Sequence, residues 1–204
     1  MSRKPNSEQR RAQIVQALMD TMAEHGYEKA TILLIARRAQ LTPGLLHYHF
    51  HSKAEILLAL VQALAGAARQ RYLALAHKAT NADERLAAYV EARLGLGEGA
   101  DAGAVAAWVV IGAEAVRQSE VRAAYQHAVD TEMALLRELL SASLAAQRKS
   151  TANVEALAAA LLALMEGTFQ LASAAPDSMP VGYAAPLAMQ LVRRFIDAEP
   201  PTGC

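Results

Sequence analysis

A short helical pattern between two turn signals constrains this chain more than any other feature. Thr42-Pro43-Gly44 opens the pattern with a hydroxyl residue at the N-cap and proline at the first helical position, where its missing N–H costs nothing. Leu46 and Phe50 follow four residues apart and predict a narrow inward face. The residues left on or near the outer face are His47, Tyr48, His49 and Lys53. A short helix that offers donors and an aromatic ring outward suits insertion into a DNA major groove.

The flanking sequence extends this pattern over residues 26–57. Its matching elements are Gly26, Ala30-Thr31, Ile35-Ala36, Ala39, Leu41-Thr42, Gly44, Leu46, Tyr48-His49-Phe50 and Lys53. In these residues and their spacing the segment resembles the helix-turn-helix domain of TetR-type transcriptional repressors. The family often has Gly where this chain has Gln40, so the turn must either avoid a positive φ or strain Gln40 slightly. The family often has Tyr where this chain has His47.

The resemblance implies that eight residues contact DNA: Thr31, Thr42, Pro43, Leu45, His47, Tyr48, His49 and Lys53. Those at the start of the recognition helix face base edges, and Leu45 suits a thymine methyl group. His47 and Tyr48 are expected to reach bases or phosphates. Thr31, His49 and Lys53 are expected to hold the DNA backbone. The alternative, an ordinary exposed helix end, accounts for the HYHFH run alone but not for the whole pattern.

Composition favours an all-helical protein. The 204 residues are 53% hydrophobic and only 5% aromatic. Ala and Leu are the dominant residue types, and runs of β-branched residues are scarce. The formal net charge is zero, but residues 1–55 carry eight Lys or Arg against five Asp or Glu. This division predicts a mildly basic N-terminal module on an acidic body. Arg3, Lys4, Arg10 and Arg11 form either a phosphate-gripping arm or a solvated terminus.

Helical periodicity and breakers predict nine helices. Their expected ranges are 7–25, 32–38, 43–49, 53–76, 83–94, 102–117, 119–147, 151–174 and 183–198. We therefore expect an all-α, nine-helix TetR-like architecture. It would have a helix-turn-helix DNA-binding domain at 1–51, a ligand-binding and dimerisation domain at 52–198 and a C-terminal tail at 199–204.

The second half carries a looser resemblance. Residues 106–122 (AAWVVIGAEAVRQSEVR) and 160–172 (ALLALMEGTFQLA) look like helices of the BetI-type branch, whose members regulate choline-to-betaine metabolism. The residues expected to bind a ligand are Trp108, Glu114, Tyr125, Met165 and Phe169. Aromatic faces with a carboxylate suit a quaternary ammonium ion through cation–π attraction. For each of these residues, a role in the core or in a dimer contact is the alternative to ligand binding. A different small ligand is the alternative to a quaternary ammonium ion.

Other chemistries find little support. The chain has no phosphate loop, nucleophile elbow or His-Glu-x-x-His pattern, so we expect no enzyme and no catalytic residue. His47 and His51 have metal-binding spacing but no adequate third ligand, so no metal or cofactor is expected. The single Cys204, the lack of an apolar leader and the short apolar run 156–165 predict a cytoplasmic protein without a membrane partner.

Together these features predict a ligand-responsive transcriptional repressor. It would bind double-stranded DNA at a palindromic operator as a homodimer through its last two helices, and a small-molecule effector would release it. The rival hypothesis is a helical small-molecule-binding or assembly protein without specific DNA binding.

Overall fold

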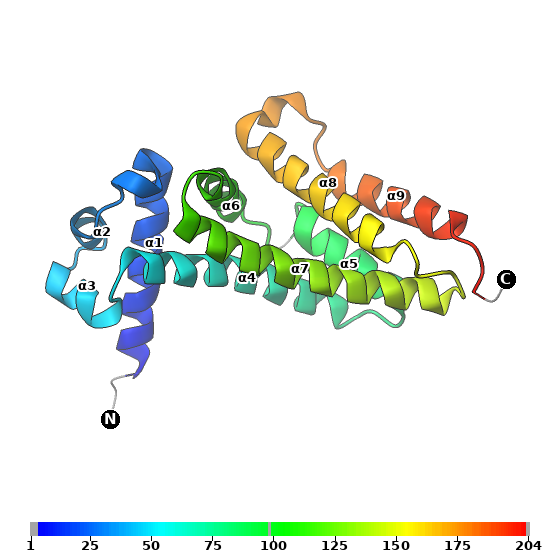
Figure 1. The fold of residues 1–204 in the computed structure, drawn as a ribbon, viewed down its shortest axis with the longest axis horizontal. Coiled ribbons are helices and arrows are strands. Elements are labelled where there is room, and N and C mark those ends of the chain that lie inside the picture. The colour runs from blue at the N-terminus through cyan, green and yellow to red at the C-terminus, as the bar shows by residue number, and fades with distance from the viewer. Residues whose placement is uncertain (1–3, 98, 203–204) are drawn as a thin grey trace. The chain divides into compact units, whose positions relative to one another are not determined.

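A computed structural model describes residues 4–97 and 99–202, with backbone only for Lys4 and Pro5. The described residues form nine α-helices and one short 3-10 helix, η1 (Figure 1). The α-helices are α1 (Lys4–Lys29), α2 (Ile32–Arg38), α3 (Pro43–His49), α4 (Lys53–Ala76), α5 (Ala82–Leu94), α6 (Ala102–Ala115), α7 (Ser119–Ala146), α8 (Val154–Ala174) and α9 (Ala184–Ala198), and η1 spans Pro176–Ser178. No strand occurs in these two ranges, so the predicted all-α class is confirmed.

The chain packs into two compact units. The first contains Met1–Ala65 and Ala107–Ala128, and the second contains Gly66–Ala106 and Val129–Cys204. Helices α4, α6 and α7 therefore each contribute residues to both units. These packing units differ from the expected functional division at residue 51, which stays a prediction about where the DNA-reading part ends.

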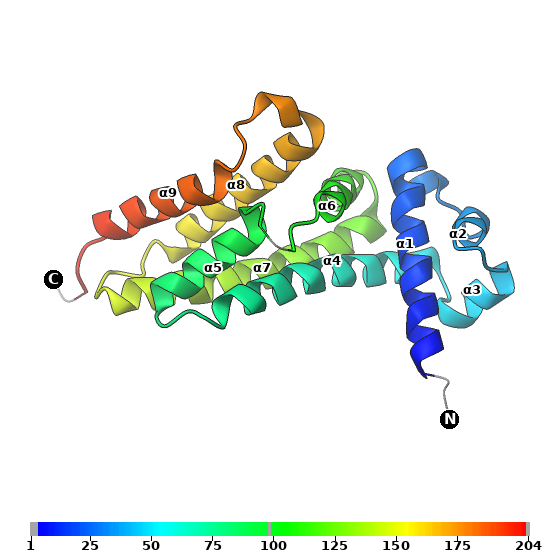
Figure 2. The ribbon, with the colours of Figure 1, turned by 180° about the vertical axis from the view of Figure 1, so that it is seen from behind.

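The first unit is built around α1, with α2 and α3 packed beside it (Figures 1 and 2). Thr31 and Thr42 begin the two short helices: each hydroxyl oxygen accepts the N–H three residues ahead, at 3.2 Å. Ile35, Leu46 and Phe50 are fully buried in the same core as Ile14 and Leu18. Apolar anchors at these spacings fix both short helices to α1.

The second unit centres on three helices. α9 packs on both α5 and α8, and the ribbons of the three helices run side by side in Figure 2. Asn81 caps α5 by accepting the Glu84 N–H at 2.9 Å. Ala184, Ala185 and Ala188 give α9 a small-residue inner face that permits close packing.

Most predicted helix bounds agree with the structure to within three residues, with some corrections. α1 already begins at Lys4, so the first helix starts earlier than predicted. The apolar side chain of Leu34 is exposed, because the buried face of α2 is formed by Ile35 and Ala36. Gly26 has φ 77° and interrupts the helical backbone of α1 where a break was predicted.

The predicted C-terminal tail packs against the second unit over its described residues. Pro201 forms a bridge with Lys149, and the Thr202 N–H donates to the Arg148 carbonyl at 2.8 Å. The Glu199 side chain is 7% exposed and accepts a hydrogen bond from Asn153 at 2.9 Å. Residues 199–202 are therefore held by hydrogen bonds to the segment after α7, with Glu199 buried and the other three residues exposed.

The turn between α2 and α3 contains a strained residue. Gln40 adopts φ 53°, one of two positive values among the described non-glycine residues. The left-handed region costs a residue with a Cβ roughly 1–2 kcal/mol, whereas glycine avoids this cost but gains freedom when unfolded.

We predict that Gln40→Gly raises the free energy of unfolding by about 0.5–1 kcal/mol, measured by urea denaturation. Ala12→Gly, at an exposed interior position of α1, is the matched control and should lower stability by about 1 kcal/mol. A destabilised Gln40→Gly variant would contradict the assigned backbone strain.

Candidate nucleic-acid interface and internal cavity

The outer face of α3 is open to solvent. Tyr48 is 76% exposed and Leu45 is 40% exposed, although Leu46, which lies between them in the sequence, is fully buried. Four further predicted DNA-contact residues are exposed: Thr31, Thr42, Pro43 and His47. The threonine oxygens accept capping hydrogen bonds, and their hydroxyl hydrogens remain able to donate to a phosphate oxygen. The first unit therefore presents six of the eight predicted residues at its surface.

The other two predicted contacts are placed differently. His49 is 9% exposed, and its ring packs edge-on against Tyr48 with centroids 5.1 Å apart. The Lys53 ammonium donates to the Tyr27 carbonyl at 2.8 Å and lies 4.0 Å from the Tyr27 ring centroid. His49 is thus largely buried, whereas Lys53 is only partly buried and its ammonium is held by the end of α1. Direct phosphate contacts by these two residues stay a prediction.

Two side chains of α1 hold the C-terminal ends of the helix-turn-helix pair. The Arg11 guanidinium donates to the His49 carbonyl at the end of α3 and lies 3.9 Å from the Phe50 ring centroid. Gln13 donates to the Ala39 carbonyl at the end of α2, at 2.6 Å. Helix ends have carbonyls without helical partners, and a cationic donor also complements the helix dipole there. Arg11 is thus a positioning residue for α3.

This placement changes the interpretation of the basic N-terminus. Arg11 is engaged by α3, and Arg10 donates to Gln13 on its own helix at 2.9 Å. Arg3 and the Lys4 side chain lie outside the described part of the chain. The role of the predicted arm therefore stays a prediction.

Tyr27 links the helix-turn-helix to the α6–α7 corner of the same unit. Its N–H donates to the Glu114 carboxylate and its hydroxyl donates to Glu120, each at 3.3 Å. A Cβ at Gly26 would lie 3.0 Å from the same Glu114 oxygen, in a backbone conformation that L-residues rarely adopt. Glycine at position 26 therefore permits the approach of Glu114.

Burial dominates the electrostatics of this cluster. It raises the pKa of Tyr27 to about 12, with a further contribution from the Glu120 carboxylate. Burial also lowers the pKa of Lys53, although Glu120, Glu28 and Glu114 act in the opposite direction. At neutral pH a neutral phenol thus donates to a carboxylate, and the cluster stays hydrogen-bonded.

The expected ligand-binding residues divide between the two units. Trp108 and Tyr125 lie in the first unit, with ring centroids 4.8 Å apart and planes inclined by 34°. Glu114 belongs to that unit and engages Tyr27. Met165 and Phe169 belong to the second unit, where Met165 is fully buried.

A cavity of about 550 Å³ lies within the second unit, a size typical of small-molecule sites. Phe169 is the one predicted ligand residue among its lining residues. Most of the wall is aliphatic or aromatic, and the charged side chains that line it are Arg71, Arg93 and Asp101. Thr168, Ser173 and Tyr183 add hydroxyl groups. This composition fits a largely apolar ligand with one polar end.

Arg93 was not among the predicted ligand-binding residues, although its helical spacing indicates a buried position. Leu86, Tyr89 and Val90 form the buried face of α5, and position 93 continues their i, i+3, i+4, i+7 spacing. A charged residue on an apolar face requires a partner or a ligand. Arg71 carried no comparable signal, because its contacts with the Ala92 and Gly95 carbonyls join segments distant in sequence.

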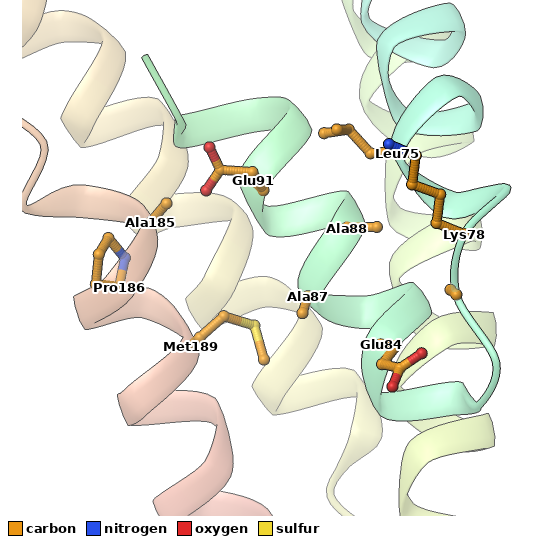
Figure 3. A pocket seen from close by; sticks show the side chains of 10 residues that line it. Leu75, Lys78, Glu84, Ala87, Ala88, Glu91, Ala185, Pro186 and Met189 are labelled. Atoms are coloured by element: carbon orange, nitrogen blue, oxygen red, sulfur yellow. The ribbon is translucent and has the colours of Figure 1, made fainter. Parts of the chain in front are cut away.

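A second hollow, of about 440 Å³, lies between the end of α4, α5 and α9 (Figure 3). In the close-up Pro186 and Met189 on α9 face Glu91 and Ala87 on α5. Glu84, at its edge, already accepts hydrogen bonds from Thr80. The other charged residues of its wall, Lys78 and Glu91, are exposed at the surface. The cavity lined by Arg71 and Arg93 is therefore the stronger candidate for a ligand-binding site.

Within the described ranges no cluster of three or more potential metal ligands occurs. One helix there, α8, is long and apolar enough to cross a membrane by length and composition, and 33% of its most apolar window is buried. A core or interface helix passes the same test, and α8 packs against α5 and α9.

Comparison with known proteins decides the family. Residues 14–60 match the model of bacterial regulatory proteins of the tetR family, and residues 82–199 match that of the BetI-type transcriptional repressor C-terminal domain. The chain belongs to the TetR family. Its relatives are transcriptional regulators rather than enzymes, and the BetI-type resemblance of the second half is confirmed.

Two relatives of this TetR-family chain illustrate the match. The HTH-type transcriptional regulator BetI of Rhizobium meliloti (strain 1021) is 33% identical over 113 residues, 55% of each chain, so that match spans about half the relative's length. BetI of Escherichia coli O17:K52:H18 is 29% identical over 198 residues, 95% of each chain.

Solved structures share the fold. A TetR-family regulator from Rhodococcus sp. superposes with a TM-score of 0.77 at 19% identity, covering 93% of this chain and 99% of that one. A regulator from Saccharomonospora viridis in complex with choline gives 0.67 at 24%, covering 94% and 97%. FadR from Bacillus subtilis in complex with stearoyl-CoA gives 0.73 at 21%, covering 89% and 96%.

We predict that Arg11→Met weakens DNA binding about 3- to 10-fold, because α3 loses a support worth ~1 kcal/mol. The slope of log K against log salt should stay unchanged, whereas a lost phosphate contact would reduce it by about 0.9. Anisotropy titrations at several salt concentrations measure both quantities. Arg10→Met controls for loss of one charge on the same helix, and a reduced slope in Arg11→Met alone would contradict the positioning role.

Proposed function

We propose that this regulator is a ligand-responsive repressor that binds a palindromic operator as a homodimer and is released by a small-molecule effector. The observation that carries the proposal is the exposed face of α3, with Tyr48 and Leu45 at its surface and Leu46 and Phe50 in the core. A helix held in this way offers side chains to base edges without unfolding its domain. Family membership supports the same function.

Dimerisation is supported by apolar surface on the last two helices. On α8 a stripe of small exposed residues comprises Ala156, Ala160, Ala163 and Gly167, and Leu171 continues it. On α9 Leu187 and Leu191 are exposed one helical turn apart. Contiguous apolar surface of this kind is typical of a protein interface. A two-fold dimer would present two copies of α3 to two half-sites of an operator.

The proposed response to ligand uses helices that contribute to both units. The cavity is lined by residues of α4, α5, α6 and α8, and α4 and α6 also contain residues of the DNA-binding unit. A ligand that binds one arrangement of these helices better than another shifts the population toward that arrangement. Linkage then requires that DNA weaken ligand binding by the same factor.

The decisive experiment is fluorescence anisotropy of the protein on its own upstream intergenic DNA at two salt concentrations, against a scrambled duplex. Tight, salt-weakened and sequence-specific binding supports the proposed repressor. Equal affinity for both duplexes, followed by failure to enrich any sequence from a random library, would favour the rival helical binding or assembly protein.

We predict that Tyr48→Ala lowers operator affinity about 5- to 100-fold while the fold and the dimer persist, because a base or phosphate contact is lost. Anisotropy measures affinity, and circular dichroism with light scattering checks structure and mass. Tyr48→Phe is the matched control, which separates the hydroxyl from the ring. Unchanged binding by Tyr48→Ala would mean that the recognition surface lies elsewhere.

We predict that Leu191→Arg converts the dimer to monomer at micromolar concentration, because a charge enters an apolar interface without a partner. Analytical ultracentrifugation measures the mass. Leu73→Arg, on α4 and 45% exposed against 46% for Leu191, is the matched control and should remain dimeric. If both variants dimerise as the wild type does, the interface is not on this face of α9.

A further inference from the structure

The apolar lining of the cavity in the second unit extends to the protein surface. Two of its apolar lining residues are strongly exposed, Leu96 at 66% and Val181 at 91%. They come from different connecting segments, since Leu96 follows α5 and Val181 lies between η1 and α9. Other lining residues are buried, such as Phe169 at 5% and Leu94 at 7% exposure. A lining that runs from exposed to buried apolar residues suits the entry of an apolar molecule.

Arg93, a charged residue of this wall, is already paired with a carboxylate. Its side chain is 13% exposed, and its Nε lies 3.3 Å from the Glu132 carboxylate. Nε has no hydrogen-bond acceptor among the described residues, but the attraction between two charges at this separation does not require that geometry. Glu132 also accepts the hydrogen bond of the Tyr89 hydroxyl, which fixes the carboxylate beside Arg93. A ligand carboxylate would therefore have to compete with Glu132.

The aromatic ring of the buried wall is engaged by the same guanidinium. The Arg93 guanidinium lies 5.0 Å from the ring centroid of Phe169, within the range of a cation–π contact. A quaternary ammonium ligand at this ring would lie close to a like charge. Neither sign of charge on a ligand thus finds an unused partner at this end of the cavity.

The other charged residues of the wall, Arg71 and Asp101, are engaged as well. The Arg71 guanidinium donates to the Ala92 carbonyl at 2.7 Å and to the Gly95 carbonyl at 2.9 Å, at the end of α5. The Asp101 carboxylate is exposed and accepts a backbone N–H at the start of α6, at 3.0 Å. Together with Glu132, the two carboxylates balance the two guanidinium groups in number. Each charge therefore serves a contact within the protein.

The uncharged polar side chains of the wall carry hydroxyl groups. They belong to Thr168, Ser173 and Tyr183. The Thr168 hydroxyl donates to the Leu164 carbonyl at 2.8 Å, so its oxygen remains able to accept a hydrogen bond from a ligand. Hydroxyl groups complement a neutral polar group such as an alcohol or an amide. Burial of an ion without a free counter-charge costs far more than burial of such a group.

We propose that this cavity binds an uncharged, largely apolar effector, and that it prefers this ligand to a carboxylate or quaternary ammonium analogue of similar size. The inference rests on the proposed effector-responsive function. It differs from the expected quaternary ammonium ligand, because Trp108, Glu114 and Tyr125 belong to the other unit. The preference follows from the engagement of the cavity's own charges within the protein.

A head-group series tests the proposal on the wild-type protein. 1-Octanol, octanoate and octyltrimethylammonium share one alkyl chain and differ in charge, and calorimetric titration at pH 7.5 compares their affinities. We expect octanol to bind at least about 10-fold more tightly than either charged compound. A charged compound that binds as tightly as octanol, or no binding of octanol, would overturn the proposal.

A substitution that fills the cavity locates the binding site. Ala106→Phe places a ring at a half-buried lining position of α6 and should weaken octanol binding at least about 10-fold. Ala104→Phe, a half-buried position of the same helix outside the lining, is the matched control and should change affinity less than about 2-fold. Circular dichroism checks the fold, and the smaller Ala106→Leu replaces the Phe variant if that does not fold. Unchanged octanol affinity in a folded variant would overturn the assignment to this cavity.

A second substitution tests the role of the ion pair by a gain of binding. Glu132→Gln removes the charge beside Arg93 but keeps a carbonyl oxygen for the Tyr89 hydroxyl. Affinity for octanoate should rise at least about 5-fold, and affinity for octanol should change less than about 2-fold. Glu138→Gln, at an exposed position of α7, is the matched control and should behave as the wild type. Unchanged octanoate affinity in Glu132→Gln would overturn the explanation by paired charges.

A separate measurement distinguishes this inference from the proposed function. DNA anisotropy with and without octanol reports release, and Ala106→Phe at the same octanol concentration controls for effects outside the cavity. Binding of octanol by calorimetry without any change in DNA affinity supports the ligand class but contradicts ligand control of DNA binding. Release of DNA by a charged compound, with none by octanol, supports ligand control and overturns the ligand class.

Discussion

The fold of the DNA-reading unit depends on burying two side chains, Leu46 and Phe50, from a helix that is too short to persist alone. An isolated helix below about 12–15 residues is marginal in water, and α3 has seven residues. Burial of a leucine or phenylalanine contributes about 1.5–3 kcal/mol each, and the Thr42 cap contributes about 1 kcal/mol. Arg11 adds a hydrogen bond at the opposite end. Because these contacts hold α3 at its inner face and its two ends, the exposed residues of its outer face are available to contact DNA.

A second set of contacts joins α1 and α4 to the α6–α7 corner. Tyr27 uses its N–H, carbonyl, ring and hydroxyl on Glu114, Lys53 and Glu120. Tyr27 is 3% exposed, so loss of a partner would leave one of its polar atoms without a hydrogen bond, which is costly. Residues from the middle of the chain therefore become part of the DNA-binding unit, although they are remote from it in sequence.

The second unit differs from the first in containing a cavity of about 550 Å³. Arg71 ties the end of α5 to α4 through two carbonyls, and Asp101 caps the start of α6. Phe169 and aliphatic residues form most of the remaining cavity wall. Exposed apolar residues on α8 and α9, such as Leu171, Leu187 and Leu191, are consistent with the proposed dimer.

The sequence alone determined the all-α class, the α2–turn–α3 unit and most helix bounds, because caps, glycines and apolar spacing act within a few residues. It also located the exposed residues of α3, since Leu46 and Phe50 define the inner face of that helix. Only the tertiary structure decided that His49 is buried, that the Lys53 ammonium binds the Tyr27 carbonyl, that Glu114 binds Tyr27 and that Arg71 and Arg93 line the cavity. Those placements depend on contacts between segments 20 to 90 residues apart, such as Lys53 with Tyr27 and Glu114 with Tyr27. Local patterning does not encode such pairings, because many side chains compete for each partner until the helices pack.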